Sequence, residues 1–580
     1  MISLQELNGL PPAQFVAALE GIFERSPWVA ERVAAERPFA TGLHLHEALC
    51  AAVQRAGSGE QLALIRAHPE LAGQAAIRGE LSAESAREQQ GAGLTACSPA
   101  EYVQLQALNR EYREKFGFPF VLAVRGHTQG SIIAALEQRL RNTPTAERRG
   151  ALDEIGRIAG FRLGERLEEP AGALIVAMAE RLARLSDHEQ GLTCSYLTPA
   201  HRATAAQIRE WMLCAGLAVQ IDAVGNVIGR WLADTPRTLL TGSHYDTVVN
   251  AGKFDGRLGV LLPIAVIAGL RRAGLRPPCS VAVIAFAEEE GVRFRSTFLG
   301  SRALAGTFDP AALEAVDAAG VRLHEAMRGA GLDPGQIPAA ALEREPLLGF
   351  VEVHIEQGPV LLHESLPVGV VTSIAGGTRC WLSITGAAGH AGTVPMHLRR
   401  DAAAAAAQIV LAVEERCRET EGLVGTVGQL AVPGGAVNVI PGRCELSIDI
   451  RAASDAVREA AVSDVIGACE RIAARRNVEL RWQKLMEIGS VPCSARLRQL
   501  WADSIQRVTG SAARHLSSGA GHDAMVMAGL TEVSMLFVRS GNGGISHHPD
   551  ETVSTADVDV AARTFADFLM HLTHPDEATT

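Results

Sequence analysis

The sequence predicts a multidomain protein, in which an all-α N-terminal domain precedes an α/β domain that an inserted α+β domain interrupts. Three observations predict this. The chain has 580 residues, too many for a single hydrophobic core. Up to about residue 167, apolar residues recur at the i, i+3, i+4 and i+7 spacing of amphipathic helices. Further on, strand-like runs such as "SVAVIAFAEEE" alternate with helical segments, a pattern typical of α/β domains.

The helical domain is expected over residues 1–167. Segments such as "PPAQFVAALEGIFE" and "PAEYVQLQALNREYREKFG" carry the helical apolar spacing, and the second begins with a capping box from Ser98 to Glu101. The last helix runs into Pro170 and Gly172, which favour a chain break. We therefore expect a linker over residues 168–175.

The α/β domain is expected over residues 176–376 and 489–580, with the insert over 377–488. The insert holds "CWLSITGAAGH", an Ala-rich helix from Asp401, and "CELSIDIRA", which predict strand, helix and strand. The glycine pairs 376–377 and 434–435 are expected at pivots or turns.

The composition excludes several classes of function. The net charge of −11 is spread along the chain without a basic run, which argues against a nucleic-acid partner and favours a small-molecule substrate. The ten cysteines are scattered without a CxxC pair, as in proteins of a reducing compartment. The longest apolar stretch, "GVLLPIAVIAGL", is too short to span a membrane, and nothing suggests export. We expect a cytoplasmic protein without membrane contact.

Polar residues with metal-binding side chains stand at the ends of several predicted strands. Each one alone has an ordinary explanation, as a hydrogen-bonded loop histidine or a solvated acidic turn. Together they supply the imidazole and carboxylate ligands that a pair of divalent ions needs, and these ligands suit Zn, Mn or Co. They are His244, Asp255, the run from Glu288 to Glu290, His354 and His547.

A series of ordered motifs over residues 175–575 resembles the metal-dependent amidohydrolases of the M20 peptidase type. The branch is that of allantoate amidohydrolases, ureidopropionases and N-carbamoyl-amino-acid hydrolases. The motifs are "GSHYDTV", "GKFDG", "EEEGVRF", "HIEQGP", "GHAGTVPM", "NVIPG", "DIR" and "SHHPDE".

The resemblance implies two divalent ions, Zn or Mn, bridged by one aspartate. His244, Asp255 and His354 would hold one ion, and Asp255, Glu290 and His547 would hold the other. Glu289 would be the general base that takes a proton from the attacking water and passes it to the leaving nitrogen. His548, which follows His547, is the alternative ligand, and the triple glutamate allows a shift by one residue.

The resemblance also assigns substrate contacts to the insert. Arg451 and Asn438 would bind the substrate carboxylate, for which a guanidinium fork is suited. His390 would stabilise the oxyanion of the tetrahedral intermediate. Gln357 and His522 are further substrate-side candidates, and His522 is equally compatible with a structural role. In this family the insert is a lid and dimerisation domain, which implies a homodimer.

Residues 1–167 resemble the 2-oxo-4-hydroxy-4-carboxy-5-ureidoimidazoline (OHCU) decarboxylases through "HPELAG", "EQ" and "KFGFPFV". By itself, a histidine before proline is most simply a helix-end residue. The resemblance implies a decarboxylase without a cofactor, in which His68 and Glu88 are the acid/base pair and Arg162 clamps the substrate. Arg157, on the same helix, is the alternative clamp. Pro69, Ser85, Gln89 and the backbone of residues 120–122 would line the pocket.

Together the two resemblances predict a bifunctional enzyme of purine degradation. One half would convert OHCU to (S)-allantoin, and the other would hydrolyse allantoate with release of ammonia and CO2. The hydrolase motifs alone do not separate allantoate from N-carbamoyl-L-amino acids or ureidopropionate. The alternatives are therefore an amidohydrolase for those substrates and a helical domain that serves only as a scaffold.

Overall fold

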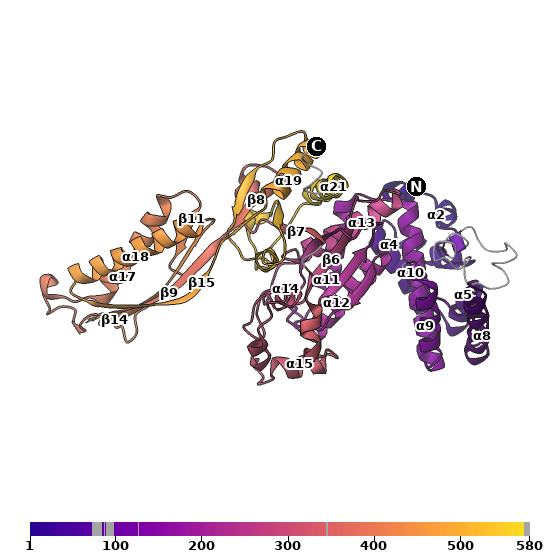
Figure 1. Ribbon diagram of the computed structural model, residues 1–580, viewed down its shortest axis with the longest axis horizontal. Coiled ribbons are helices and arrows are strands. Elements are labelled where there is room, and N and C mark those ends of the chain that lie inside the picture. Colours follow the sequence, from indigo (N-terminus) through magenta and orange to yellow (C-terminus); the bar gives the residue numbers. More distant parts are fainter. Residues whose placement is uncertain (72–83, 86–87, 89–97, 126, 344–345, 573–580) are drawn as a thin grey trace. The chain divides into compact units, whose positions relative to one another are not determined.

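The computed structural model describes residues 1–71, 84–85, 88, 98–125, 127–343 and 346–572 (Figure 1). The chain divides into two compact units. The first comprises Met1–Leu348, Val353–Pro367 and Val538–Thr580, and the second comprises Gly349–Glu352 and Val368–Phe537. None of the helices in the described part of the chain is both long and apolar enough to cross a bilayer.

The N-terminal part of the first unit is helical, as predicted. Its helices surround a core that includes Phe15, Leu45, Tyr112 and Leu136, all fully buried. The longest helix, α10 (Pro144–Arg166), carries both candidate arginines. The other elements are β1 (Ile2–Ser3), α1 (Leu4–Gly9), α2 (Pro12–Ala18), α3 (Trp28–Val33), η1 (Ala34–Glu36), α4 (Gly42–Arg55), α5 (Ser58–Ala67), α8 (Pro99–Phe116), α9 (Gln129–Arg139) and β2 (Leu167–Glu168), which pairs with β1 in parallel.

Local sequence chemistry explains where these helices begin and end. The predicted capping box at α8 is confirmed: the Ser98 hydroxyl accepts the Glu101 N–H at 3.3 Å, and the Glu101 carboxylate accepts the Ser98 N–H at 3.0 Å. Beyond α10, helix α11 (Ala171–Ala183) begins directly after Pro170. The segment expected to be a linker therefore already contains the first turn of the next helix.

The α/β part of the first unit is built on a sheet with the strand order β7-β5-β6-β4-β3. Strands β5 and β6 are parallel and buried along almost their whole length, which accounts for their continuous apolar runs. Helix α13 packs against β5, and α11 and α21 pack against α13 (Figure 1). The strands are β3 (Ala218–Ile221), β4 (Val227–Trp231), β5 (Thr238–His244), β6 (Ser280–Phe286) and β7 (Leu347–Ile355).

The helices of this part are α12 (Pro199–Cys214), α13 (Arg257–Arg272), α14 (Leu299–Leu304), α15 (Leu323–Gly329), α16 (Val360–His363) and α21 (Thr555–His571), with the 3-10 turns η3 (Pro310–Glu314), η4 (Pro334–Ala340) and η6 (Asn542–Gly544). Three segments with candidate ligands lie at neighbouring strand ends. His244 ends β5, Glu288–Glu290 lie one residue beyond the end of β6, and His354 lies near the end of β7.

The second unit contains an antiparallel sheet with the order β11-β14-β9-β15, and β12 also pairs with β14. Helices α17 and α18 lie along one side of this sheet, and both pack against β9 and β14 (Figure 1). Its strands and helices are β9 (Gly376–Thr385), β10 (Gly389–His390), η5 (Met396–Leu398), α17 (Ala402–Arg418), β11 (Leu423–Thr426), β12 (Leu430–Ala431), β13 (Val439–Ile440), β14 (Arg443–Ala452), α18 (Asp455–Arg475) and β15 (Glu479–Ile488).

Residues 377–488, predicted as an α+β insert, thus form strands and two long helices; their role as a lid stays a prediction. The rest of the second unit follows the order β16-β8-β18, with β17 beside β8. Its elements are β8 (Val368–Ile374), β16 (Val491–Pro492), α19 (Ala495–Thr509), β17 (His515–Ser518), α20 (Asp523–Met527) and β18 (Val533–Val538).

Candidate active sites

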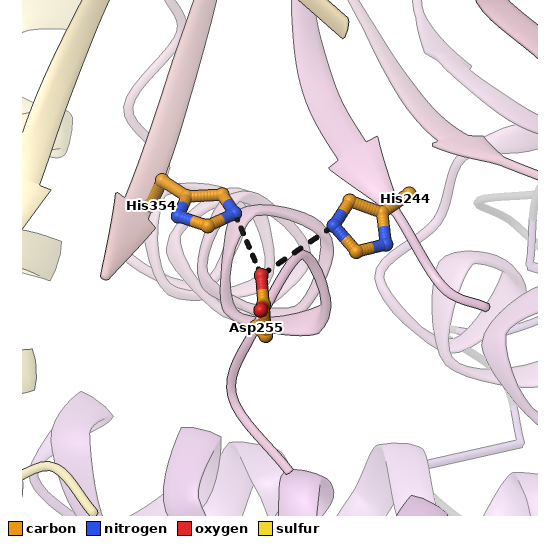
Figure 2. A group of neighbouring side chains, drawn as sticks. All are labelled: His244, Asp255 and His354. Carbon is orange, nitrogen blue, oxygen red and sulfur yellow. Dashed lines mark ion pairs between the residues drawn. The ribbon is translucent and has the colours of Figure 1, made fainter. Parts of the chain in front are cut away.

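Two histidines and one aspartate meet beside the N-terminus of α13 (Figure 2). Oδ1 of Asp255 lies 3.6 Å from Nε2 of His244 and 3.2 Å from Nε2 of His354. All three side chains are buried. Asp255 reaches this position because Gly256 follows it. Gly256 has φ +63°, and a Cβ there would lie 2.4 Å from atoms of the His244 ring.

Hydrogen bonds fix how the two imidazoles are protonated. Nδ1 of His354 lies 2.8 Å from the carbonyl oxygen of Ile355, and Nδ1 of His244 lies 3.1 Å from that of Asp246. A carbonyl only accepts, so both Nδ1 atoms carry protons. In the neutral rings Nε2 then carries the lone pair, and that of His354 accepts the Gly256 N–H at 3.2 Å. The two Nε2 atoms lie close to Oδ1 of Asp255, and nitrogen and oxygen atoms gathered in this way fit a divalent cation.

The pKa values describe the same site without metal. Burial by itself would lower the pKa of His244, but hydrogen bonds to Asp246 and Asp255 raise it well above its usual value. Burial likewise opposes ionisation of Asp255, whereas hydrogen bonds from the surrounding imidazoles hold the pKa of this carboxyl well below its usual value. The hydrogen bonds from the imidazoles thus favour the ionised form of Asp255.

The second oxygen of Asp255 faces a different group. Its Oδ2 lies 3.1 Å from Nε2 of His547, and this nitrogen lies 3.6 Å from Oε1 of Glu290. Burial, together with the charges of Asp255 and Asp246, raises the pKa of Glu290 to about 7. The neighbouring His548 points elsewhere: its Nδ1 accepts the N–H of Asp550 at 3.2 Å.

Asp246 is a site residue that sequence reasoning missed. It is buried, and its carboxylate accepts the backbone N–H groups of Glu289 at 3.1 Å and Glu290 at 3.2 Å. Its Oδ1 also lies 3.3 Å from Nδ1 of His244. Asp246 thereby ties the end of β5 to the turn after β6. The sequence feature that could have identified Asp246 is its place two residues after the candidate ligand His244, in "HYD". Oxygens of Glu289 and Glu290 lie within 4.8 Å of a His244 nitrogen.

A buried hydrogen-bond network centred on Glu551 holds the backbone of Asp255. Glu551 is fully buried and accepts the N–H groups of Phe254 at 2.9 Å and Asp255 at 3.1 Å, and the Ser546 hydroxyl at 2.8 Å. Burial and the charge of Asp255 raise the pKa of Glu551, whereas these donors favour its ionised form. Nε2 of Gln357, a predicted substrate-side residue, donates to Oδ2 of Asp255 at 2.8 Å.

The predicted substrate residues of the second unit lie in two places. His390 in β10 pairs with Val439 of β13, so that it is brought next to Asn438, whose carbonyl accepts the Ala391 N–H at 2.9 Å. His390 and Asn438 are exposed.

Arg451 in β14 donates to Asp449 at 3.0 and 3.1 Å and to the Gly519 carbonyl at 2.8 Å. His522 is buried, with Nε2 2.7 Å from the Ser518 hydroxyl.

In the helical domain, the buried Arg162 forms hydrogen bonds with two other predicted site residues, Glu88 and Ser85. Arg162 donates from Nε and Nη2 to the two carboxylate oxygens of Glu88, both at 2.9 Å. It also donates to the Ser85 hydroxyl at 3.1 Å and to Glu24 at 3.0 Å. Glu24 is buried and was not singled out from the sequence, because nothing in "GIFERS" distinguishes it from a surface residue.

The positive charge of Arg162 acts on the imidazole of His68. Burial, and next the positive charge of Arg162, lower the pKa of His68 to about 3. Its Nε2 has no hydrogen-bond partner among the described residues. His68 caps the C-terminus of α5, and the half-buried Pro69 follows it. The imidazole is thus held neutral at physiological pH.

The other predictions for this domain have separate outcomes. Arg157 donates to Glu154 at 2.6 Å and to Glu210 at 2.8 Å, so it does not belong to the Arg162 cluster. Phe120, Val121 and Leu122 are buried, and the Val121 carbonyl accepts from Arg139 at 2.7 Å. Gln89 lies outside the described residues.

The chain matches two family models: residues 8–164 match OHCU decarboxylase, and residues 240–571 match peptidase family M20/M25/M40. An N-carbamoyl-L-amino acid amidohydrolase of Geobacillus stearothermophilus is 44% identical over 374 residues, which cover 64% of this chain and 91% of the relative. A probable allantoate deiminase of Oryza sativa subsp. japonica is 40% identical over 431 residues, which cover 68% of this chain and 87% of the relative.

Among solved structures, a hydantoinase/carbamoylase-family amidase from Burkholderia multivorans superposes with a TM-score of 0.64 at 30% identity. The superposition covers 69% of this chain and 97% of the amidase.

Proposed function

Because the chain belongs to peptidase family M20/M25/M40 over residues 240–571 and carries an OHCU decarboxylase domain over residues 8–164, we propose that it is a bifunctional enzyme of ureide degradation. The helical domain decarboxylates OHCU to (S)-allantoin. The hydrolase domain hydrolyses allantoate with one water to ureidoglycine, ammonia and CO2. A second water converts ureidoglycine to ureidoglycolate and releases a second ammonia. A homodimer through residues 377–488 and a cytoplasmic location belong to the same proposal.

The observation that carries the hydrolase proposal is the division of ligands around Asp255. One of its oxygens faces His244 and His354, and the other faces His547, as a carboxylate bridging two ions requires. Glu290 completes the second group. These nitrogen and oxygen donors fit two ions of Zn or Mn. When bound, such ions polarise the scissile carbonyl and ease deprotonation of the attacking water.

The chain's own residues then handle the proton and the substrate. Glu289, whose backbone N–H is held by Asp246, takes the proton of the attacking water and gives it to the leaving nitrogen. His390 donates to the developing oxyanion. Gln357 and His522 add contacts on the substrate side.

Arg451 and Asn438 bind the substrate carboxylate. Contacts within the described residues use three of the five guanidinium N–H donors of Arg451, two to Asp449 and one to Gly519. The remaining two suit a carboxylate. Hydrogen bonds to Asp449 also raise the pKa of Arg451, so the side chain stays cationic.

In the helical domain, neutral His68 accepts the proton of the substrate hydroxyl group that becomes a carbonyl, and the acid/base pair of His68 and Glu88 returns a proton to the ring carbon as CO2 leaves. Arg162 provides the positive charge beside them. No cofactor is needed, because the ring itself accepts the electrons of the broken C–C bond. A scaffold function would not require a buried imidazole whose Nε2 has no hydrogen-bond partner among the described residues, since such a group costs stability. Ser85, which donates to Glu24 beside Arg162, and Pro69, which follows His68, complete the proposed substrate-binding residues.

The choice between allantoate and an N-carbamoyl-L-amino acid rests on the fused domain. The OHCU decarboxylase domain favours allantoate, because both reactions then belong to one route. The 44% identity to the Geobacillus amidohydrolase favours the second candidate, N-carbamoyl-L-amino acid hydrolysis. The test is kcat/KM of the intact, metal-loaded chain on allantoate and on a series of N-carbamoyl-L-amino acids. If allantoate is no better than the best member of the series, the second candidate replaces the first.

A further inference from the structure

We infer that Glu551 is a positioning residue that locks the loop carrying Asp255 to the loop carrying His547, so that both ligands are in place before metal binds. The inference rests on the proposed metal centre but not on the identity of the substrate. Phe254 and Asp255 belong to the segment before α13, and Ser546 immediately precedes His547. One buried carboxylate holds groups from both segments.

The hydrogen bonds around Glu551 form a consistent donor-to-acceptor chain. Two backbone N–H groups, of Phe254 and Asp255, point at its Oε1, and the Ser546 hydroxyl points at its Oε2. Ser546 in turn accepts from Nε2 of Gln357 at 3.2 Å. The other proton of that Gln357 amide goes to Oδ2 of Asp255. The Ser546 hydroxyl also lies 3.1 Å from Oδ2 of Asp255, but its shorter hydrogen bond is to Oε2 of Glu551 at 2.8 Å. Both carboxylate oxygens of Glu551 thus accept hydrogen bonds from protein donors.

This arrangement makes Glu551 a supporting residue and not a metal ligand. It reaches the centre through the backbone of Asp255, whose side chain faces both groups of ligands, and through Ser546, next to the third histidine. Loss of its carboxylate would leave two buried N–H groups without their acceptor. The loop before α13 would then be free to turn Asp255 away from the imidazoles.

A glycine provides independent support. A Cβ on Gly252 would lie 2.2 Å from Cδ and Oε1 of Glu551. Gly252 does not have a positive φ, so its backbone conformation does not require glycine. The residue leaves room for the Glu551 carboxylate against the loop, which explains the glycine at the start of "GKFDG".

The test compares metal binding by four full-length variants. Glu551→Ala removes the carboxylate, Glu551→Gln keeps one acceptor oxygen, and Gly252→Ala displaces Glu551 with all polar groups retained. Asp550→Asn is the matched control, because Asp550 is an adjacent but exposed carboxylate that lies near His548. Zn content, dissociation constants from chelator competition, and the visible spectrum of the Co-loaded protein are measured, with circular dichroism to verify folding.

We expect Glu551→Ala and Gly252→Ala to weaken binding of at least one ion by about 10- to 100-fold and to alter the Co spectrum. Glu551→Gln should have a smaller effect and Asp550→Asn none. If Glu551→Ala does not fold, Gly252→Ala and Glu551→Gln carry the test. Wild-type dissociation constants for both ions in all folded Glu551 and Gly252 variants would overturn the inference. A wild-type chain that binds two ions but does not hydrolyse allantoate would contradict the proposed substrate and not this role.

Discussion

Arg162 and Glu88 are joined by two parallel hydrogen bonds of 2.9 Å, from Nε to Oε1 and from Nη2 to Oε2. The other N–H groups of Arg162 are also used, by the Gly21 carbonyl and Glu24 on Nη1 and by Ser85 on Nη2. All N–H groups of the Arg162 guanidinium therefore donate hydrogen bonds within the protein. An anionic substrate would have to exchange with one of these acceptors, and Arg162 also fixes the direction of the Glu88 carboxylate.

The first prediction follows from this fork. Arg162→Lys keeps the charge but offers a point donor instead of a planar pair, so Glu88 is no longer held. We expect decarboxylation of OHCU to fall by about 100-fold or more, with hydrolysis of allantoate unchanged. Arg157→Lys on the same helix is the comparison. If Arg157→Lys loses decarboxylation and Arg162→Lys keeps it, the two assignments must be exchanged.

The second prediction concerns His68 and acid stability. Burial and Arg162 lower the pKa of His68 to about 3 from its usual 6.5. The unfolded chain therefore binds more protons between these pH values, and the free energy of unfolding falls as pH drops from 6.5 toward 3. For His68 alone the loss is about 2 kcal/mol between pH 7 and pH 5.

His68→Gln should remove this contribution. Urea unfolding of both full-length proteins at pH 7 and pH 5 measures it, and the pH dependence of the shared metal site cancels in the difference. Equal pH slopes for the two proteins would mean that His68 is not buried as a neutral imidazole.

The third prediction separates the bridging ligand from a terminal one. Asp255→Ala removes the carboxylate whose two oxygens face the two ligand groups, so both ions should be lost. His547→Ala should weaken mainly one ion, because His244 and His354 still face Asp255. Metal content by mass spectrometry after gel filtration is the measurement. Two ions retained by the Asp255→Ala protein would refute the bridging assignment.

Glycine-flanked polar residues after apolar runs were enough to single out the residues that meet around Asp255. The signal is local, because each motif stands at one strand end. Asp246 and Glu551 could not be found in this way. The contacts of Asp246 with Glu289 and Glu290 depend on the pairing of β5 with β6, in which His244 stands opposite Phe286. Those of Glu551 join positions 297 residues apart.

The same distinction holds for the fold. The start of α8 was predictable, because Ser98 and Glu101 cap each other within one turn. The strand order β7-β5-β6-β4-β3 was not, because it is set by burial of strand faces distant in sequence. Glu24 illustrates this for the helical domain, since its partner Arg162 lies 138 residues away.

The fourth prediction tests the proton carrier of the hydrolase. Glu289→Gln keeps the size of the side chain and the backbone N–H that Asp246 holds, but the amide cannot accept the proton of the attacking water. We expect two ions to remain bound while kcat on allantoate falls by about 100- to 10,000-fold. Asp550→Asn, an exposed carboxylate change, serves as the control. Turnover near the wild-type value would assign the proton transfer to another group.

The last prediction concerns the independence of the two halves. Among the described residues, every candidate metal ligand lies at or after His244 in the sequence. None of them belongs to the helical domain. In the proposed decarboxylation, His68 and Arg162 act without a metal. A chelator should therefore abolish ammonia release from allantoate and leave CO2 release from OHCU unchanged. His68→Ala should have the reverse effect, and it also corrects for spontaneous decarboxylation of OHCU. Both activities are measured in the same chelated sample.

If decarboxylation is lost along with hydrolysis, the hydrolase domain must hold the helical domain in its active form, through contacts such as that of Arg157 with Glu210. In that case Arg157→Ala should reproduce the loss without a chelator.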